Sequence, residues 1–225
     1  MTRIYVICEG QTEETFIYEV LAPELMKSQI YLVPCLIRKG KSGSRSTKGG
    51  GVKYQRVLDN IKLLLNDKNA LCTTFFDFYG LDDDFPGKKQ AIAAGIDAID
   101  KSKIFISEFI SCLQVDLPEH HRRVIPYVQM YEFEGLLFSE PDMLADNINV
   151  DIAKITTIAD QFATPEDINN SKETAPSKRI EKLCPSYDKV IQGNMTALDI
   201  GYQKIAKKCL LFASWVEQIK NVVND

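Results

Sequence analysis

The chain has 225 residues, of which 45% are hydrophobic, 26% charged and 9% aromatic. These values are typical of a globular protein whose core needs neither disulfides nor metals, and they exclude collagen-like, disordered and small disulfide-stapled proteins. With 27 lysines and arginines against 31 aspartates and glutamates, the formal net charge is -4. This charge argues against a protein that coats nucleic acid with its whole surface, but it allows a local basic patch.

Cysteine and histidine usage narrows the chemistry further. The six cysteines form no C-x-x-C pair, and the first residues lack the long apolar core of a signal peptide. No apolar run is long enough to span a bilayer, so we predict a cytoplasmic protein with reduced, mainly structural thiols. The two histidines, His120 and His121, are adjacent, which disfavours His-rich zinc sites and a Ser-His-Asp triad.

Strand-like and helix-like segments alternate through the first 140 residues. The strands are predicted at residues 4–8, 30–37, 71–76 and 124–130, and amphipathic helices lie between them. This alternation predicts an α/β fold with a mainly parallel sheet flanked by helices.

Beyond Pro141 the strand signals disappear, and helix-like stretches follow near residues 150–162, 176–184 and 196–219. We therefore predict an α/β core over residues 1–145 and a helical extension over residues 146–225 that packs on it.

Carboxylates follow the predicted strands at the positions where ligands bind in parallel sheets. Glu9 follows the first strand, Asp77 closes the third, and Glu132 and Glu134 follow the fourth. Two such charges about 4 Å apart repel by roughly 4 kcal/mol at an effective dielectric of 20. A hard divalent cation, Mg²⁺ or Mn²⁺, would relieve this repulsion and suit phosphodiester chemistry. The alternative is that each acid is a solvated loop residue.

Several sequence blocks resemble a known family. The run into Glu9-Gly10 resembles the first motif of Toprim domains, which occur in topoisomerases, primases and overcoming-lysogenization-defect nucleases. More closely, the chain resembles a prokaryotic family of free-standing Toprim-like proteins, a domain of unknown function. The blocks that carry this resemblance are residues 9–14 (EGQTEE), 77–81 (DFYGL), 85–87 (FPG), 129–138 (QMYEFEGLLF) and 176–179 (PSKR).

The resemblance implies a Toprim-like, Rossmann-like core in which Glu9 is the general acid/base or a metal-linked carboxylate and Asp77 is a metal ligand. Toprim domains typically carry Asp-x-Asp here, whereas Tyr79 stands in place of the second acid. The missing oxygen is then expected from the following loop or from the fourth strand; the candidates are Asp82, Asp83, Asp84, Glu132 and Glu134.

Residues 38–53 form the one strongly positive window. This window contains five glycines and no acid, and its six cations are Arg38, Lys39, Lys41, Arg45, Lys48 and Lys53. Cations on a glycine-rich backbone suit phosphate contact, so we predict that the window binds nucleic acid; the alternative is a solvated charged loop. It is not a Walker loop, because Cys35 stands where the leading glycine is required.

Two functions follow as hypotheses. The first is a Mg²⁺-dependent phosphodiester-cleaving enzyme, a nuclease acting on DNA or RNA, and the resemblance implies a setting in phage defence. The second is a non-catalytic Toprim-like subunit that binds nucleic acid or a partner ATPase, which Tyr79 favours. A small-molecule phosphatase is a third reading, which would not need the basic window. Lys178 and Arg179 are expected to dock onto the acidic rim; the alternative is that they contact an outside phosphate.

Overall fold

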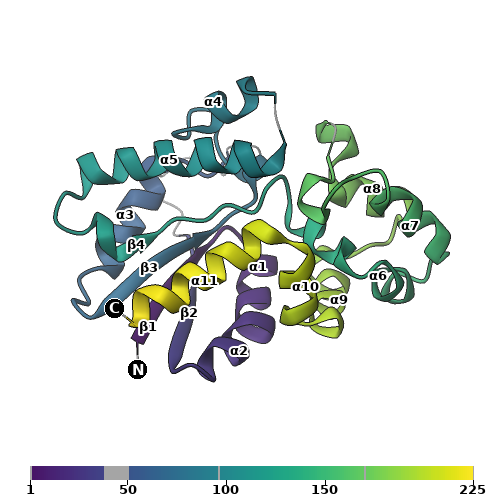
Figure 1. The fold of residues 1–225 in the computed structure, drawn as a ribbon, viewed down its shortest axis with the longest axis horizontal. Coiled ribbons are helices and arrows are strands. Elements are labelled where there is room, and N and C mark those ends of the chain that lie inside the picture. Colours follow the sequence, from purple (N-terminus) through teal and green to yellow (C-terminus); the bar gives the residue numbers. More distant parts are fainter. Residues whose placement is uncertain (1, 38–50, 96, 170, 225) are drawn as a thin grey trace, which may run out of the picture.

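A computed structural model describes residues 2–37, 51–95, 97–169 and 171–224 (Figure 1). Its centre is a four-stranded, all-parallel sheet in the order β2-β1-β3-β4. The strands are β1 (Thr2–Cys8), β2 (Ile30–Leu36), β3 (Ala70–Phe75) and β4 (Val124–Ile125). Helices flank this sheet, so the predicted α/β, Rossmann-like fold class is confirmed.

The sheet buries both faces, as the apolar composition of its strands requires. In β1, Ile4, Val6 and Cys8 belong to one core cluster, whereas Ile7 belongs to the other. The first cluster is covered by α1 (Gln11–Phe16), η1 (Ile17–Leu21), α2 (Ala22–Met26) and α11 (Leu210–Asn224). The second is covered by α3 (Tyr54–Leu64), α4 (Lys88–Ala93) and α5 (Ala98–Asp116), which lie across the sheet from α11 (Figure 1).

The fourth strand is shorter than predicted, since only Val124–Ile125 is regular strand. Pro126 has no N–H to donate to the ladder, and the Thr74 hydroxyl takes over both backbone groups of Tyr127. It donates to the Tyr127 carbonyl at 2.7 Å and accepts from the Tyr127 N–H at 2.9 Å. The chain nevertheless keeps its course beside β3, because Asp77 and Gln129 form an isolated parallel bridge.

The second half is helical, as predicted, but more finely divided. The long helix expected over residues 196–219 is instead α9 (Asn194–Ile200), α10 (Tyr202–Lys208) and α11. Gly201, with φ of 79°, ends α9, and the extended backbone of Cys209 separates α10 from α11. The other elements are η2 (Phe78–Gly80), η3 (His121–Arg123), η4 (Phe133–Ser139), α6 (Pro141–Asn147), α7 (Ile152–Ala159), η5 (Pro165–Asp167), η6 (Lys172–Thr174), α8 (Pro176–Leu183) and η7 (Lys189–Gly193).

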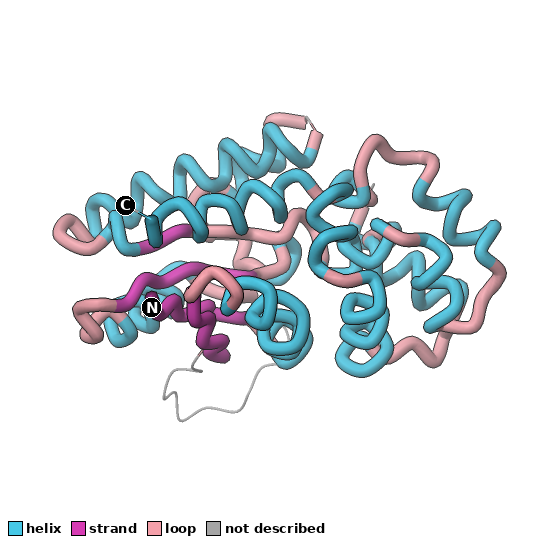
Figure 2. The backbone as a smooth tube through the Cα atoms, turned by 60° about the horizontal axis from the view of Figure 1, so that its bottom comes forward, coloured by secondary structure: helices cyan, strands magenta, loops and turns pink. Residues whose placement is uncertain are grey.

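The helical extension and the sheet share one hydrophobic core. Phe16 and Phe75 belong to the same cluster as Ile180, Phe212 and Trp215. The return of α11 to the sheet is visible in Figure 2, where the chain ends beside the strands. The predicted boundary after residue 145 stays a prediction. Within the described ranges, no helix has the length and apolarity needed to cross a bilayer.

Candidate functional site: a carboxylate cluster around Lys189

The carboxyl ends of β1 and β3 bring acidic side chains together. Because β1 and β3 are hydrogen-bonded neighbours, Glu9 after β1 and Asp77 after β3 reach the same edge of the sheet. The chain segment that passes Asp77 at Gln129 then turns at Tyr131, a non-glycine residue with φ of 64°. This turn returns the backbone toward Asp77 and delivers Glu134 to the same place.

Lys189, the first residue of η7, lies among these acids. Its Nζ atom is 2.9 Å from Oδ2 of Asp77, 3.4 Å from Oε2 of Glu134 and 3.6 Å from Oε1 of Glu13. We call Glu9, Glu13, Asp77 and Glu134 with Lys189 the carboxylate cluster. It unites four carboxyl groups and one ammonium, so its charges do not balance if all the acids are ionised.

Backbone donors fix two of the acids. Oδ1 of Asp77 accepts a hydrogen bond from the Phe133 N–H at 2.7 Å. Oε2 of Glu13 accepts from the N–H of Gly10, the N-cap of α1, at 2.9 Å. Both acids are therefore held in place before any ligand binds.

Glu9 is fixed less completely than Asp77 and Glu13. Its Oε2 atom is buried without a hydrogen-bond partner. Burial, with further contributions from Asp77 and Glu13, raises the pKa of Glu9 to about 7. Gly80 makes room for this carboxyl group, since a Cβ atom at residue 80 would lie 2.0 Å from Oε2 of Glu9.

Glu134 is fully buried, and neither of its carboxyl oxygens has a hydrogen-bond partner. Burial raises the pKa of Glu134 to about 8, although Lys189 opposes this effect. For Lys189 itself, burial lowers the pKa, but the nearby Asp77, Glu134 and Glu13 carboxylates outweigh burial and raise it. Lys189 is therefore a cation at neutral pH, whereas Glu134 is readily protonated.

The other predicted acids are used elsewhere. Oε2 of Glu132 accepts from the Ser177 N–H at 2.9 Å, at the start of α8, so Glu134 rather than Glu132 lies against Lys189. Asp82 accepts from the Asp84 N–H, and the exposed Asp84 pairs with Lys89. Tyr79 packs against the ring of Tyr131, with ring centroids 5.7 Å apart.

The predictions for the basic side chains have different outcomes. Arg38, Lys39, Lys41, Arg45 and Lys48 lie outside the described residues. Lys53 is exposed at the N-cap of α3. The expected docking of Lys178 and Arg179 is wrong: Lys178 pairs with Glu181, and Arg179 bonds to the Thr174 carbonyl and stacks on Phe162. The cation that the extension supplies to the acids is instead Lys189.

The oxygen atoms of the cluster are suitable ligands for a hard cation, but the side chains are not arranged around a cation site. Carboxylate oxygens are the right ligands, and Oε2 of Glu9 and both oxygens of Glu134 lack hydrogen bonds. However, no three Asp, Glu, His or Cys side chains in the described ranges are arranged to hold a metal ion. The ammonium of Lys189 lies between the acids instead.

Comparison with known proteins gives one family. A family model described as a domain of unknown function, DUF4276, matches residues 8–220. The chain belongs to the DUF4276 family. None of the curated proteins and none of the solved structures compared with it matches. All five members of the carboxylate cluster fall within the DUF4276 match.

Two members of the cluster in this DUF4276 chain were not predicted. Glu13 was not singled out as a site residue, although it lies in the same EGQTEE block as Glu9. Lys189 had no local signal, because it is 112 positions from Asp77 and meets it only through the packing of the extension.

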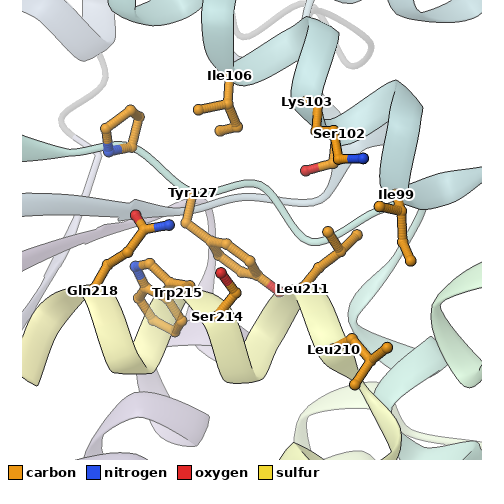
Figure 3. A pocket seen from close by; sticks show the side chains of 11 residues that line it. Ile99, Ser102, Lys103, Ile106, Tyr127, Leu210, Leu211, Ser214, Trp215 and Gln218 are labelled. Atoms are coloured by element: carbon orange, nitrogen blue, oxygen red, sulfur yellow. The ribbon is translucent and has the colours of Figure 1, made fainter.

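A separate cavity of about 290 Å³ lies between α5, α11 and the segment after β4. Figure 3 shows Tyr127 and Trp215 side by side in its wall, and their rings stack with centroids 4.5 Å apart. Its lining includes no acidic residue. This cavity of the DUF4276 chain is therefore distinct from the carboxylate cluster.

Proposed function

We propose that the protein is a Mg²⁺- or Mn²⁺-dependent phosphodiester-cleaving enzyme that acts on nucleic acid, with the carboxylate cluster as its active centre. The observation that carries the proposal is Glu9. Its half-buried carboxyl group has a buried oxygen without a partner and a pKa of about 7, at the sheet edge where ligands of parallel α/β folds bind. A group with this pKa exchanges protons efficiently at neutral pH.

The residues of the carboxylate cluster then have the following roles. Glu9 takes a proton from the attacking water or returns one to the leaving oxygen. Asp77 and Glu134, with Glu9, would hold the cation, which would lower the pKa of bound water and neutralise phosphate charge. The ammonium of Lys189, which lies among these acids, would contact a phosphate group bound there.

Two further observations support the nucleic-acid substrate. The window over residues 38–53 carries six cations and no acid, and such a segment contacts phosphate regardless of sequence. The resemblance of residues 6–13 to the first Toprim motif supports the same chemistry, whereas Tyr79 departs from it. The phage-defence setting rests on this resemblance alone.

The test is an assay with labelled single- and double-stranded DNA and RNA, in the presence of Mg²⁺, Mn²⁺ or a chelator. We expect cleavage that requires the metal and disappears in Glu9→Gln, while the unfolding midpoint of this variant is not lowered. Glu181→Gln, an exposed acid on α8, is the matched control and should cleave normally. Full activity in Glu9→Gln would refute the role of Glu9.

Lys189 favours a second function, a non-catalytic subunit that binds nucleic acid or a partner ATPase. Its ammonium already neutralises part of the acidic charge without a metal. In that case the cluster is a structural junction between the sheet and the extension. Absence of cleavage together with absence of metal binding would select this function.

A further inference from the structure

An exposed apolar face adjoins the carboxylate cluster. Tyr18 on η1 is 64% exposed, Ile191 on η7 is 60% exposed, and Met195 and Leu198 on α9 are 55% and 54% exposed. Tyr31 on β2 adds a further ring, 41% exposed. Large apolar side chains gathered on one face mark an interaction surface rather than scattered surface residues.

The face is hollowed in two neighbouring places. One hollow of about 450 Å³ lies between η1 and β2, with Tyr18 and Tyr31 in its wall. The other, about 230 Å³, lies between η1 and α9, with Ile191 and Met195 in its wall. Thr15 and Glu19 line both, so the two hollows adjoin, and we call them together the α1–α9 groove.

The charge of the α1–α9 groove has one sign. Glu14 and Glu19 are its charged lining residues in the described part of the chain, where no lysine or arginine lines it. A second copy docked by a two-fold axis would place both copies' acids in one interface without a lysine or arginine from the lining to pair with them, which is unfavourable. A partner with lysine or arginine beside apolar side chains is complementary.

The edge of the sheet indicates the shape of the occupant. The Gln29 carbonyl and the Ile37 N–H bond to β1. The backbone N–H and C=O groups of odd-numbered residues in β2 therefore point toward β1, and those of even-numbered residues point toward the open edge of the sheet. Pro34 therefore has no N–H at an edge-facing position. Strand addition is interrupted there, whereas a helix laid into the groove needs no backbone pairing.

We propose that the α1–α9 groove binds an amphipathic helix of a partner protein, whose apolar side chains meet Ile191 and Met195 and whose basic side chains meet Glu14 and Glu19. The elements that form the groove also carry Glu13 and Lys189 of the carboxylate cluster. A docked helix therefore contacts α1 and η7, the two elements that carry Glu13 and Lys189. The inference stands whether or not the cluster is catalytic.

The test uses a fluorescent synthetic helix of leucine and lysine and a matched helix with glutamate in place of every lysine, measured by fluorescence anisotropy. We expect the wild type to bind the lysine helix and Met195→Asp to bind it about tenfold more weakly or worse, as for loss of an interface anchor. The added negative charge would by itself strengthen binding, so weakening reports the apolar contact. Val115→Asp, at a residue 79% exposed on α5, is the control and should bind as the wild type does.

Charge reversal tests the acidic rim separately. Glu19→Lys should weaken binding of the lysine helix and strengthen binding of the glutamate helix. Equal weakening by Met195→Asp and Val115→Asp, or equal binding of both helices to the wild type, would overturn the proposal. If sedimentation shows a dimer that Met195→Asp dissociates, the groove binds a second copy instead. If the lysine helix binds only after residues 40–50 are deleted, the groove is occupied by this chain's own basic window.

Discussion

The Nζ atom of Lys189 lies 2.9 Å from Oδ2 of Asp77, although 112 positions separate the two residues. Asp77 ends the sheet and Lys189 begins η7 in the helical extension. The extension thus supplies the cation that the acids of the sheet lack. The site is therefore a product of both parts of the chain.

Replacement of Lys189 by Met should destabilise the protein, because Asp77 and Glu134 lose their ammonium partner. Removing one partner of a fully buried pair costs about 3–5 kcal/mol. The Lys189 side chain is 34% exposed, so we expect about 2 kcal/mol. Urea unfolding at neutral pH measures this loss. Lys178→Met, which removes an exposed pair with Glu181, should cost less than about 1 kcal/mol; equal costs would contradict the account.

Stability should fall as the pH rises from about 5 to 8.5. The pKa of Glu9 is raised to about 7 and that of Glu134 to about 8, so the folded state binds more protons than the unfolded state in this window. We expect a loss of several kcal/mol, measured by urea unfolding across the pH series. Glu134→Gln carries no titrating proton and should flatten the profile; an unchanged slope would refute this assignment.

A methyl group at residue 80 should displace Glu9 without unfolding the protein. The Cβ atom of Gly80→Ala would meet Oε2 of Glu9, the mobile end of a side chain, so the stability cost should stay below about 1 kcal/mol. The carboxyl group then turns toward water, and its pKa falls toward the ordinary value. A ¹³C titration of the glutamate carboxyls measures this pKa, with Glu9→Gln to assign the signal. A Glu9 signal that still titrates near pH 7 would contradict the role of Gly80.

The sheet and its acidic edge were predictable because their signals are local. The continuous apolar run over residues 4–8 in β1 indicates a strand buried on both faces. Parallel strands end at one edge, so Glu9 and Asp77 were expected together before any coordinates were known. The shortening of β4 was harder to predict, because the Thr74 side chain replaces the ladder hydrogen bonds to Tyr127 only in the folded state.

The cation of the site could not be predicted from sequence in the same way. Lys178 and Lys189 look alike as lysines near the start of helical segments. Only the packing of the extension decides that Lys178 faces Glu181 at the surface while Lys189 reaches Asp77. The division of residues 196–219 into separate helices likewise depends on the backbone of Gly201 and Cys209.

The extension should prove indispensable for the fold. Trp215 stacks on Phe75 and Tyr127, and its Nε1–H donates to Oγ1 of Thr73 at 2.8 Å. Trp215→Ala should cost about 3–5 kcal/mol in urea unfolding. A fragment of residues 1–145 should fail to show a cooperative transition, because it lacks α11 and so exposes part of one face of the sheet. A fragment that unfolds cooperatively would instead establish residues 1–145 as an independent domain.

The most direct test of the carboxylate cluster is the thermal unfolding midpoint with and without millimolar Mn²⁺ or Mg²⁺, for the wild type and for Asp77→Asn. Asparagine keeps an acceptor for the Phe133 N–H but removes the charge. A cation that binds the folded state alone raises the midpoint of the wild type, and the shift should be largely absent in Asp77→Asn. A wild-type midpoint that the ions leave unchanged, or an equal shift in both proteins, would contradict a cation-binding centre at Asp77.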